Sequence, residues 1–365
     1  MYIVYEEGQE VMRRQFLERL SWIDLFLWML RIGVVILIVF GTIRSLAAGK
    51  YSAATWLSLV IAGLAQGSIY ALIALGYTLI YGVLLMINFA HGEVYMAGAL
   101  TSTIVAEVLA QSGIPQRYPI PTIGLLLLVS MAVSGSVAVL LERVAYRPLR
   151  GAPRLVPLIT AIGASFALQY IFRGLFGSRF HTYPEFGRMW GQWSLGGTNI
   201  QVVQVVVFVA AVVMMVGLYF FVERTKTGKS LRAVAEDKEI AALMGIDVDR
   251  VIAITFLIGG VLAGAAGVCR GLYQPQGIWF FMGFFPGLKA FTAAVLGGIG
   301  SIQGAMLGGL FLGIFESVGP NLFLEGVGIP AAYQLKDVIA FTMLVLVLMF
   351  RPQGIMGERL AEKKA

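Results

Sequence analysis

Apolar residues run through this chain in long stretches that are separated by short polar segments. A membrane-spanning helix needs about 20 apolar residues, because the hydrocarbon layer is roughly 30 Å thick and a helix rises 1.5 Å per residue. The pattern predicts an all-α polytopic membrane protein with eight full transmembrane helices, at about 25–46, 56–80, 93–111, 121–142, 155–176, 201–222, 251–270 and 337–350. The glycine-rich stretch 289–316 predicts a re-entrant hairpin or two short helices.

Composition supports this class and excludes others. Hydrophobic residues make up 58% of the 365 residues and charged residues only 13%, with a mean hydropathy of +0.83. These values are far from those of a soluble domain. The net charge of +7 is not arranged as a basic stripe with interleaved aromatic residues, so we expect no nucleic-acid partner. Cys269 is the single cysteine, which excludes a disulfide framework within the chain, and we expect no metal site.

The positions of Lys and Arg predict the orientation of the spans. Most of these residues lie in 1–24, 143–154, 223–250 and 351–365, on one side of the predicted topology. Cytoplasmic loops carry the excess of Lys and Arg, so both termini are expected in the cytoplasm and membrane lipid around the spans.

Three parts of the chain are expected. Residues 1–52 form an N-terminal extension with one extra span. Its first part is either a short interfacial helix, on which Met12, Phe16 and Leu20 share one face, or a polar leader without fixed structure. Residues 53–357 form the permease domain, and 358–365 form a cytoplasmic tail.

A polar break lies between the second predicted span, 56–80, and the third, 93–111. No Asp, Glu, Lys or Arg occurs from Tyr51 to Gly92, and the run ends in Asn88-Phe89-Ala90-His91-Gly92-Glu93. Unsatisfied polar groups cost several kcal/mol in hydrocarbon, so a broken helix at membrane depth predicts a protein-lined or water-filled path.

Three roles are open for this break. Asn88 and Glu93 cap the freed backbone groups, or Phe89, His91 and Glu93 contact a passing substrate, or His91 and Glu93 carry out chemistry. Capping is favoured, and the chemical role is the least favoured, because no HExxH motif and no nucleophile motif accompany the pair. We therefore expect no catalytic residue.

Other polar and glycine residues within the apolar stretches are further candidates for a path or gate. Gly297, Gly298 and Gly300 form either a second break or a site of close helix packing. Polar side chains within the spans either line a path or bond neighbouring helices; they are Gln66, Ser68, Tyr70, Tyr77, Thr78, Thr160, Ser165 and Gln169.

The longest charged segment, 223–250, predicts a protruding helix between two glycines that needs a receptor. Leu231, Val234, Leu243 and Met244 form an apolar ridge on this helix, and Gly245 ends it. The stretch Glu239-Ile240-Ala241-Ala242-Leu243-Met244-Gly245 resembles the E-A-A-x-x-x-G signature of ABC importer permeases, with Ile240 in place of the first alanine. The resemblance implies a helix that couples to an ATPase through Glu236, Asp237, Glu239, Ala241, Ala242 and Gly245.

Three further segments resemble one family closely. They are Met86–Met96, Glu142–Arg150 and Ala290–Ser301, and they are similar to the branched-chain amino acid ABC transporter permease of LivH type. The match extends from about Leu57 to Gly357, which leaves the first 50 or so residues outside it. The resemblance implies a bacterial inner-membrane subunit with a second permease of LivM type, two cytoplasmic ATPase subunits, a periplasmic substrate-binding protein and an amino-acid substrate.

No nucleotide cofactor is expected on this chain. The tripeptide Gly228-Lys229-Ser230 could close a P-loop, but Glu223 stands where that motif requires its first glycine. ATP and Mg are therefore expected in the partner ATPases, and the chain itself is not expected to be an enzyme.

Two rival functions are kept open. Similar permeases carry urea, short-chain amides or aromatic acids, and the sequence does not exclude such cargo. An ion-coupled secondary transporter would need acidic residues in several spans. The acidic residues of the membrane part lie near the ends of predicted segments; they are Glu93, Glu107, Glu142, Glu316 and Asp337.

Overall fold

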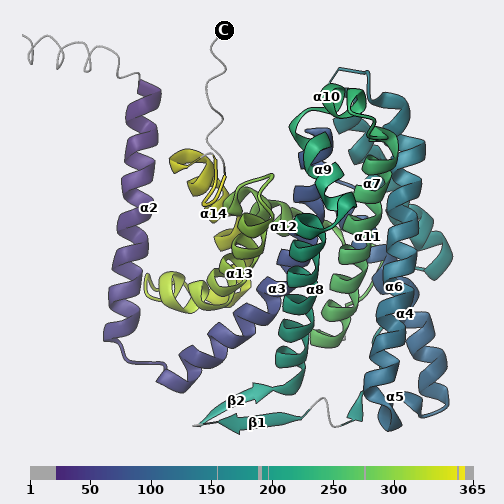
Figure 1. Cartoon of the computed structure of the whole chain (residues 1–365). Coiled ribbons are helices and arrows are strands. Elements are labelled where there is room, and N and C mark those ends of the chain that lie inside the picture. Colours follow the sequence, from purple (N-terminus) through teal and green to yellow (C-terminus); the bar gives the residue numbers. More distant parts are fainter. Residues whose placement is uncertain are drawn as a thin grey trace, which may run out of the picture. The chain divides into compact units, whose positions relative to one another are not determined.

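A computed structural model describes residues 22–153, 155–187, 191–195, 197–274, 277–351 and 353–357. Within them, nine helical segments are long and apolar enough to cross a membrane. Their helices are α2 (Trp22–Ala47), α3 (Ala53–Leu84), α4 (His91–Gln111), α6 (Pro119–Leu141), α7 (Leu155–Phe176), α8 (Val202–Arg224), α11 (Val248–Tyr273), α13 (Ile302–Gly319) and α14 (Lys336–Phe350) (Figure 1). The predicted interfacial helix near the N-terminus and the tail 358–365 lie outside the described residues.

All eight predicted spans are confirmed as helices, and the ninth comes from the glycine-rich stretch. This stretch forms α12 (Phe284–Gly297) and then α13. At 1.5 Å per residue, the 14 residues of α12 extend about 21 Å, less than the roughly 30 Å of hydrocarbon. The expectation of two short helices holds for α12, whereas α13 continues through a π-helical turn, Pro320–Leu324, and reaches the length of a span.

Chain contacts divide the protein into two compact units. The boundaries fall between Lys50 and Tyr51, between Val318 and Gly319, and between Leu335 and Lys336. In the smaller unit, α2 packs on the π-helical turn 320–324, where a Cβ on Gly41 would collide with the backbone of Phe323. Ser45 Oγ also donates to the Asn321 carbonyl at 2.8 Å.

The core of the larger unit lies where α11 packs against α3, α4 and α6. Among the candidate spans, α3 and α11 are the most buried. Small residues permit this packing: a Cβ on Gly264 of α11 would lie 2.5 Å from the Ser130 carbonyl oxygen of α6, and the Ser130 hydroxyl donates to the Gly264 carbonyl at 2.7 Å. Close backbone approach of this kind is the usual basis of helix packing in membranes.

The predicted break between the second and third spans is present. Ser52 caps α3 at its start, and Leu85 ends it in the left-handed conformation with φ of 55°. Residues 86–90 are irregular, and α4 begins at His91. The break is therefore a connection between two separate helices.

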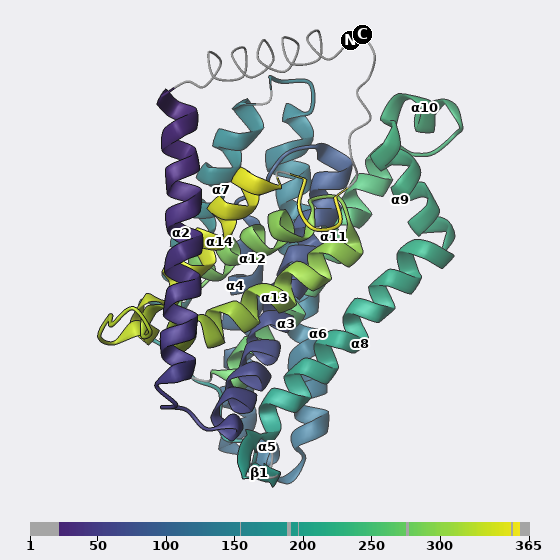
Figure 2. The ribbon, with the colours of Figure 1, turned by 90° about the vertical axis from the view of Figure 1, so that its left-hand side faces the viewer.

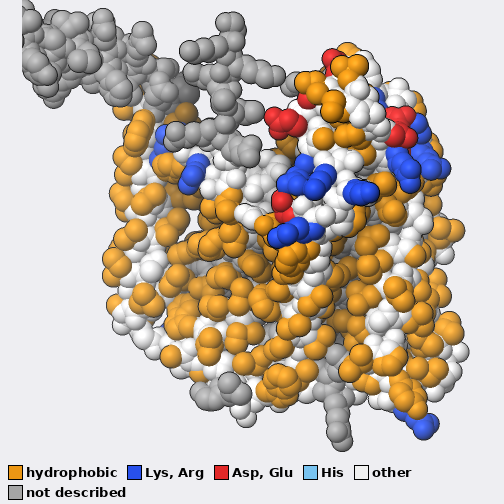
Figure 3. Space-filling view, viewed as in Figure 1, with side chains coloured by type: hydrophobic (Ala, Val, Ile, Leu, Met, Phe, Trp, Pro, Cys, Tyr) orange, Lys and Arg blue, Asp and Glu red, His pale blue; other side chains and the backbone are white. Residues whose placement is uncertain are grey.

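The two ends of the larger unit carry different elements. At one end lie α5 (Ile114–Arg117) and an antiparallel hairpin of β1 (Gln192–Leu195) and β2 (Thr198–Gln201), in which Gln192 pairs with Gln201. At the opposite end, α8 leads into α9 (Lys226–Glu236) and α10 (Lys238–Leu243), which project beyond it (Figures 1 and 2). In Figure 3, charged side chains gather towards the end with α9 and α10, above a wall of hydrophobic side chains.

Candidate translocation and coupling sites

Asn88 lies in the irregular connection and joins it to the end of α6. Its side-chain oxygen accepts from the Ala90 backbone N–H at 3.1 Å and from the Tyr146 hydroxyl at 2.6 Å. Tyr146 closes a π-helical turn, Glu142–Tyr146, which continues α6 and re-aims its side chains. Asn88 thus satisfies a freed backbone donor, as the capping role requires.

His91 begins α4 and is fully buried against α3. Its ring centroid lies 4.9 Å from that of Tyr77, with the planes at 69°. A Cβ on Gly76 would collide with the imidazole, so the missing side chain at Gly76 provides the space that His91 fills. These contacts give His91 a packing role.

Glu93 is buried in the first turn of α4, and its partners differ from those expected of a capping residue. Its Oε1 accepts from Gln169 Nε2 at 2.7 Å and from the Ser165 hydroxyl at 3.3 Å, both on α7. Its Oε2 has no hydrogen-bond partner among the described residues. Glu93 is therefore held by side chains of a neighbouring helix instead of by the backbone groups of its own helix.

A cavity of about 230 Å³ lies beside this carboxylate. Glu93 and Ser165 contribute polar groups to its wall. The rest of the wall is mainly aromatic and aliphatic, and includes Tyr77, Phe89, Ile162, Phe166, Phe284 and Leu288. A mostly apolar cavity with a few placed polar groups is typical of a small-molecule site.

Three glycines bring the start of α4 against the start of α12 beside the cavity. A Cβ on Gly92 would lie 2.5 Å from the Gly283 carbonyl oxygen, and one on Gly287 would lie 3.0 Å from the Gly92 Cα. A Cβ on Gly283 would also lie 2.7 Å from Glu93 Oε2. Side chains larger than hydrogen at these positions would push the two helices apart.

Gln66 and Tyr70, which were predicted to line the path, belong to a different cluster. There Lys289 on α12 donates to Glu316 on α13 at 2.7 Å, to Asp337 on α14 at 2.6 Å and to the Tyr70 hydroxyl at 3.4 Å. Gln66 accepts from Arg270 on α11 at 3.3 Å. This buried ionic cluster could not be predicted from the sequence, because its members come from five helices.

Gly297, Gly298 and Gly300 lie in a third place, at the end of α12 and in the turn to α13. Gly298 and Gly300 have φ of 108° and 99°, values that side-chain-bearing residues rarely adopt. Residues near the C-terminus pair with this turn, since the Ile355 and Met356 N–H groups donate to the Leu296 and Gly297 carbonyls at 2.9 and 2.8 Å. The predicted path residues are thus divided among three places.

The predicted coupling helix is two helices, which corrects the expectation of one continuous ridge. Asp237 separates α9 from α10 and caps α10, its Oδ1 accepting from the Glu239 and Ile240 N–H groups at 2.8 and 3.0 Å. Gly245, with φ of 83°, follows the end of α10.

The supposed apolar ridge is divided between two surfaces. Leu231 and Val234 are residues of α9 and are buried. Leu243 and Met244, at the end of α10, are 87% and 79% exposed. Together with Ile240 they form an exposed apolar surface that we call the α10 tip. Glu236, Glu239 and Ala242 are also exposed, and Ala241 is buried beneath the helix.

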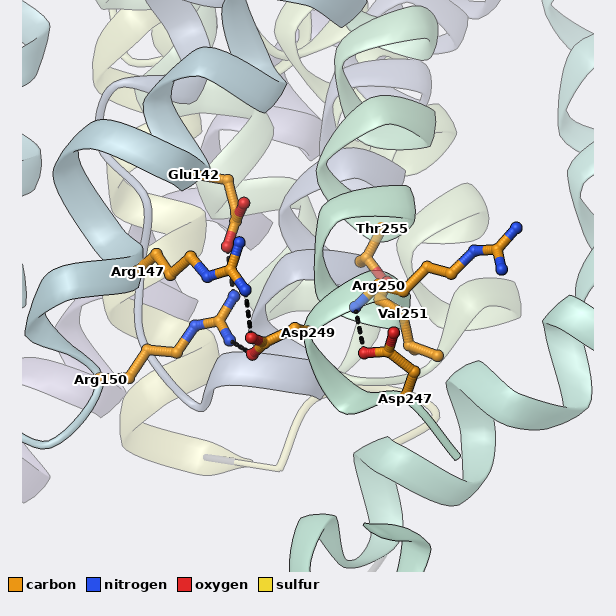
Figure 4. Close-up of polar contacts among 8 residues, drawn as sticks. All are labelled: Glu142, Arg147, Arg150, Asp247, Asp249, Arg250, Val251 and Thr255. Atoms are coloured by element: carbon orange, nitrogen blue, oxygen red, sulfur yellow. Dashed lines mark hydrogen bonds and ion pairs between the residues drawn. The ribbon is translucent and has the colours of Figure 1, made fainter. Parts of the chain in front are cut away.

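An arginine cluster lies between the end of α6 and the start of α11 (Figure 4). Arg147 and Arg150 each donate to one oxygen of Asp249, and Arg150 also bonds Glu142. Asp247 caps α11 by accepting from the Arg250 backbone N–H at 3.0 Å. The Arg147–Asp249 and Arg150–Asp249 pairs, 102 and 99 positions apart in the chain, could not be predicted from the sequence.

The arginine cluster lies within electrostatic reach of α10. Partial burial lowers the pKa of Lys238, and the nearby positive charge of Arg150 lowers it further. Lys238 is the first residue of α10, so the start of the predicted coupling segment lies near the arginine cluster.

This chain is similar to the members of one known protein family. Residues 59–348 match the family described as the permease component of the branched-chain amino acid transport system. The high-affinity branched-chain amino acid transport permease BraD of Pseudomonas aeruginosa is 44% identical over 84% of this chain and 98% of its own. Its counterpart LivH of Escherichia coli K12 is 43% identical over 82% of this chain and 95% of its own.

A solved structure described as an inward-facing conformation of a metal-chelate type ABC transporter aligns with 88% of this chain and 99% of its own, at 16% identity and a TM-score of 0.43. The family match covers most of the residues from α3 to α14, and both relatives are covered over nearly their full length. This chain is a multi-pass membrane protein that belongs to the family of branched-chain amino acid transport permeases.

Proposed function

We propose that this chain is a transmembrane permease subunit of an ATP-driven importer for branched-chain and other hydrophobic amino acids in a bacterial inner membrane. The proposed coupling to ATP hydrolysis is supported by one observation, the exposed apolar surface of the α10 tip. Ile240, Leu243 and Met244 are 59%, 87% and 79% exposed on the six-residue helix α10 and the residue that follows it, which project from the larger unit. Apolar side chains presented in this way at a water-facing end favour a protein partner.

The proposed partners follow from family membership and from the lack of a P-loop in the sequence. Two cytoplasmic ATPase subunits bind ATP and Mg and receive the α10 tip. A second permease of LivM type completes the membrane part, and a periplasmic binding protein delivers the amino acid. The end with α9 and α10 then faces the cytoplasm. Residues 1–52 remain an extension of unassigned role.

The coupling path begins at α10 and continues through the arginine cluster. Movement of α10 shifts Lys238 relative to Arg150, which holds Glu142 at the end of α6 and Asp249 at the start of α11. Both helices pack on α4, which carries Glu93. Closure of the ATPases thereby acts on the cavity and switches its access between the two membrane faces.

The test is a Leu243→Asp/Met244→Asp double variant of the complete importer in proteoliposomes. Because both side chains are exposed, the permease should fold normally, while ATPase stimulation by the binding protein and leucine uptake should fall together by at least about tenfold. The matched control is Lys229→Asp on the exposed face of α9. Unchanged uptake and unchanged ATPase activity in the double variant would refute the coupling role of the tip.

A further inference from the structure

The cavity beside Glu93 combines a buried carboxylate with a mostly apolar wall. Glu93 is 1% exposed, and its Oε1 is held by Gln169 and Ser165. Its Oε2 lies beside Gly283 without a hydrogen-bond partner among the described residues. A buried carboxylate in such surroundings requires a proton or a cation to balance it.

The chemistry of the wall distinguishes between the possible cations. Ca²⁺ and Mg²⁺ demand about six oxygen ligands, whereas the cavity wall offers mainly the side chains of Phe89, Ile162, Phe166, Phe284 and Leu288. A primary ammonium needs only a few acceptors and tolerates apolar surroundings on its carbon side. The site therefore fits an organic amine that carries a branched aliphatic group.

We propose that this cavity is a binding site in the membrane for the transported amino acid, in which the Glu93 carboxylate accepts hydrogen bonds from the α-ammonium group. Gln169 and Ser165 fix the orientation of the carboxylate, and the aromatic and aliphatic wall takes the hydrophobic side chain. This assignment rests on the proposed function for its substrate class. It adds that the permease itself recognises the amino group, in addition to any selection by the binding protein.

The contact between α4 and α12 explains how the carboxylate is reached. Gly92, Gly283 and Gly287 hold the two helix starts in backbone contact, so Glu93 Oε2 is covered by Gly283 in this conformation. A separation of α12 from α4 would uncover Glu93 Oε2 to the cavity.

The first experiment measures ligand binding to the purified complete importer without its binding protein. Saturation-transfer NMR is recorded with isoamylamine, which keeps the ammonium and the branched chain, and with 4-methylpentanoate, which lacks the ammonium. We expect a signal for isoamylamine and at least about tenfold less for 4-methylpentanoate. Equal signals for the two probes, or none for isoamylamine, would overturn the proposal.

Variants then assign the binding to Glu93. Glu93→Gln keeps an acceptor for Gln169 but removes the charge, and should abolish the isoamylamine signal. Glu93→Asp should retain a weaker signal. Glu107→Gln, which neutralises a half-exposed carboxylate outside the cavity, is the matched control and should bind as the wild type does. An isoamylamine signal that survives in Glu93→Gln would overturn the assignment.

Leucine uptake by the wild-type importer separates this proposal from the proposed function. If the wild type carries leucine and Glu93→Gln carries it equally well, the ammonium site is wrong and the transport function stands. If the wild type carries no hydrophobic amino acid, the proposed function fails, and the ammonium site fails with it as a transport site.

Discussion

Lys289 Nζ lies 2.6 Å from a carboxylate oxygen of Asp337, a residue 48 positions further along the chain, and 2.7 Å from Glu316 on a third helix. Lys289 and Glu316 are both buried, with side chains 6% and 5% exposed. One lysine thus joins α12, the helix too short to span the hydrocarbon, to α13 and α14. This ionic contact holds together the C-terminal part of the larger unit.

Lys289→Met should destabilise the protein by about 3–5 kcal/mol, because it leaves the Glu316 carboxylate buried without a cation. Thermal unfolding of the detergent-solubilised protein measures the change. Lys289→Met/Glu316→Gln removes one charge of each sign and should recover part of the loss, while exposed Lys229→Met is the control and should unfold as the wild type does. Equal stability of the wild type and the single variant would contradict a structural role for the ion pair.

Gly283→Ala should lower both stability and uptake. Its Cβ would collide with the Gly92 carbonyl oxygen and lie 2.7 Å from Glu93 Oε2, so α12 must move away from α4. Overpacking of this kind costs about 1–3 kcal/mol. The matched control is Gly163→Ala in α7, where the added methyl meets nothing within 4 Å. Thermal unfolding and leucine uptake are measured on both, and similar behaviour of the two variants would exclude a tight crossing at Gly283.

Arg147 and Arg150 should respond differently to neutralisation, although both bond Asp249. Arg147 and Asp249 have half-exposed side chains, so Arg147→Gln should change thermal stability little. Arg150 also pairs with Glu142, whose side chain is 1% exposed, so Arg150→Gln leaves a buried acceptor without its donor and should cost about 2 kcal/mol. Arg150→Gln should also lower the number of leucine molecules carried per ATP. Equally small losses of thermal stability in the two variants would show that Arg150 is not needed to stabilise the buried Glu142 carboxylate.

His91→Asn should leave leucine uptake within about twofold of the wild type at every pH tested. The imidazole fills the space beside Gly76 and packs on Tyr77, so its loss should reduce stability by about 1–2 kcal/mol through poorer packing. Uptake and unfolding are measured from pH 5.5 to 8 on the same preparations. Loss of uptake in a protein that unfolds at the wild-type temperature would instead assign chemistry to His91.

The spans and the break at Asn88 could be predicted from the sequence because their signals are local. A run of apolar residues long enough to cross the bilayer predicts a span whatever its neighbours in the fold. The helix ends at left-handed Leu85, and the irregular residues 86–90 lie where the polar residues begin. The separate α9 and α10 had a local signal as well. Asp237 is a strong N-cap residue followed by Glu239, and its presence inside the charged segment marked the start of a new helix.

Contacts between helices could not be predicted in this way. Lys289 meets Glu316 and Asp337 only because α12, α13 and α14 pack together, and nothing within 27 residues of Lys289 in the chain indicates that pairing. The same holds for Glu93, whose partners on α7 are more than 70 positions away. Gln66 and Tyr70 were grouped with Glu93 as polar residues in spans, but they face the ionic cluster instead.

The break at Asp237 also makes α10 a separable module. Six residues, Lys238–Leu243, are bounded by the cap at Asp237 and by left-handed Gly245, and the buried apolar contacts of α9 lie wholly before that cap. Under the proposed function, the choice of ATPase partner resides in this short cassette. Exchanging these six residues between related permeases would then change which ATPase binds, without altering the membrane helices that surround the substrate.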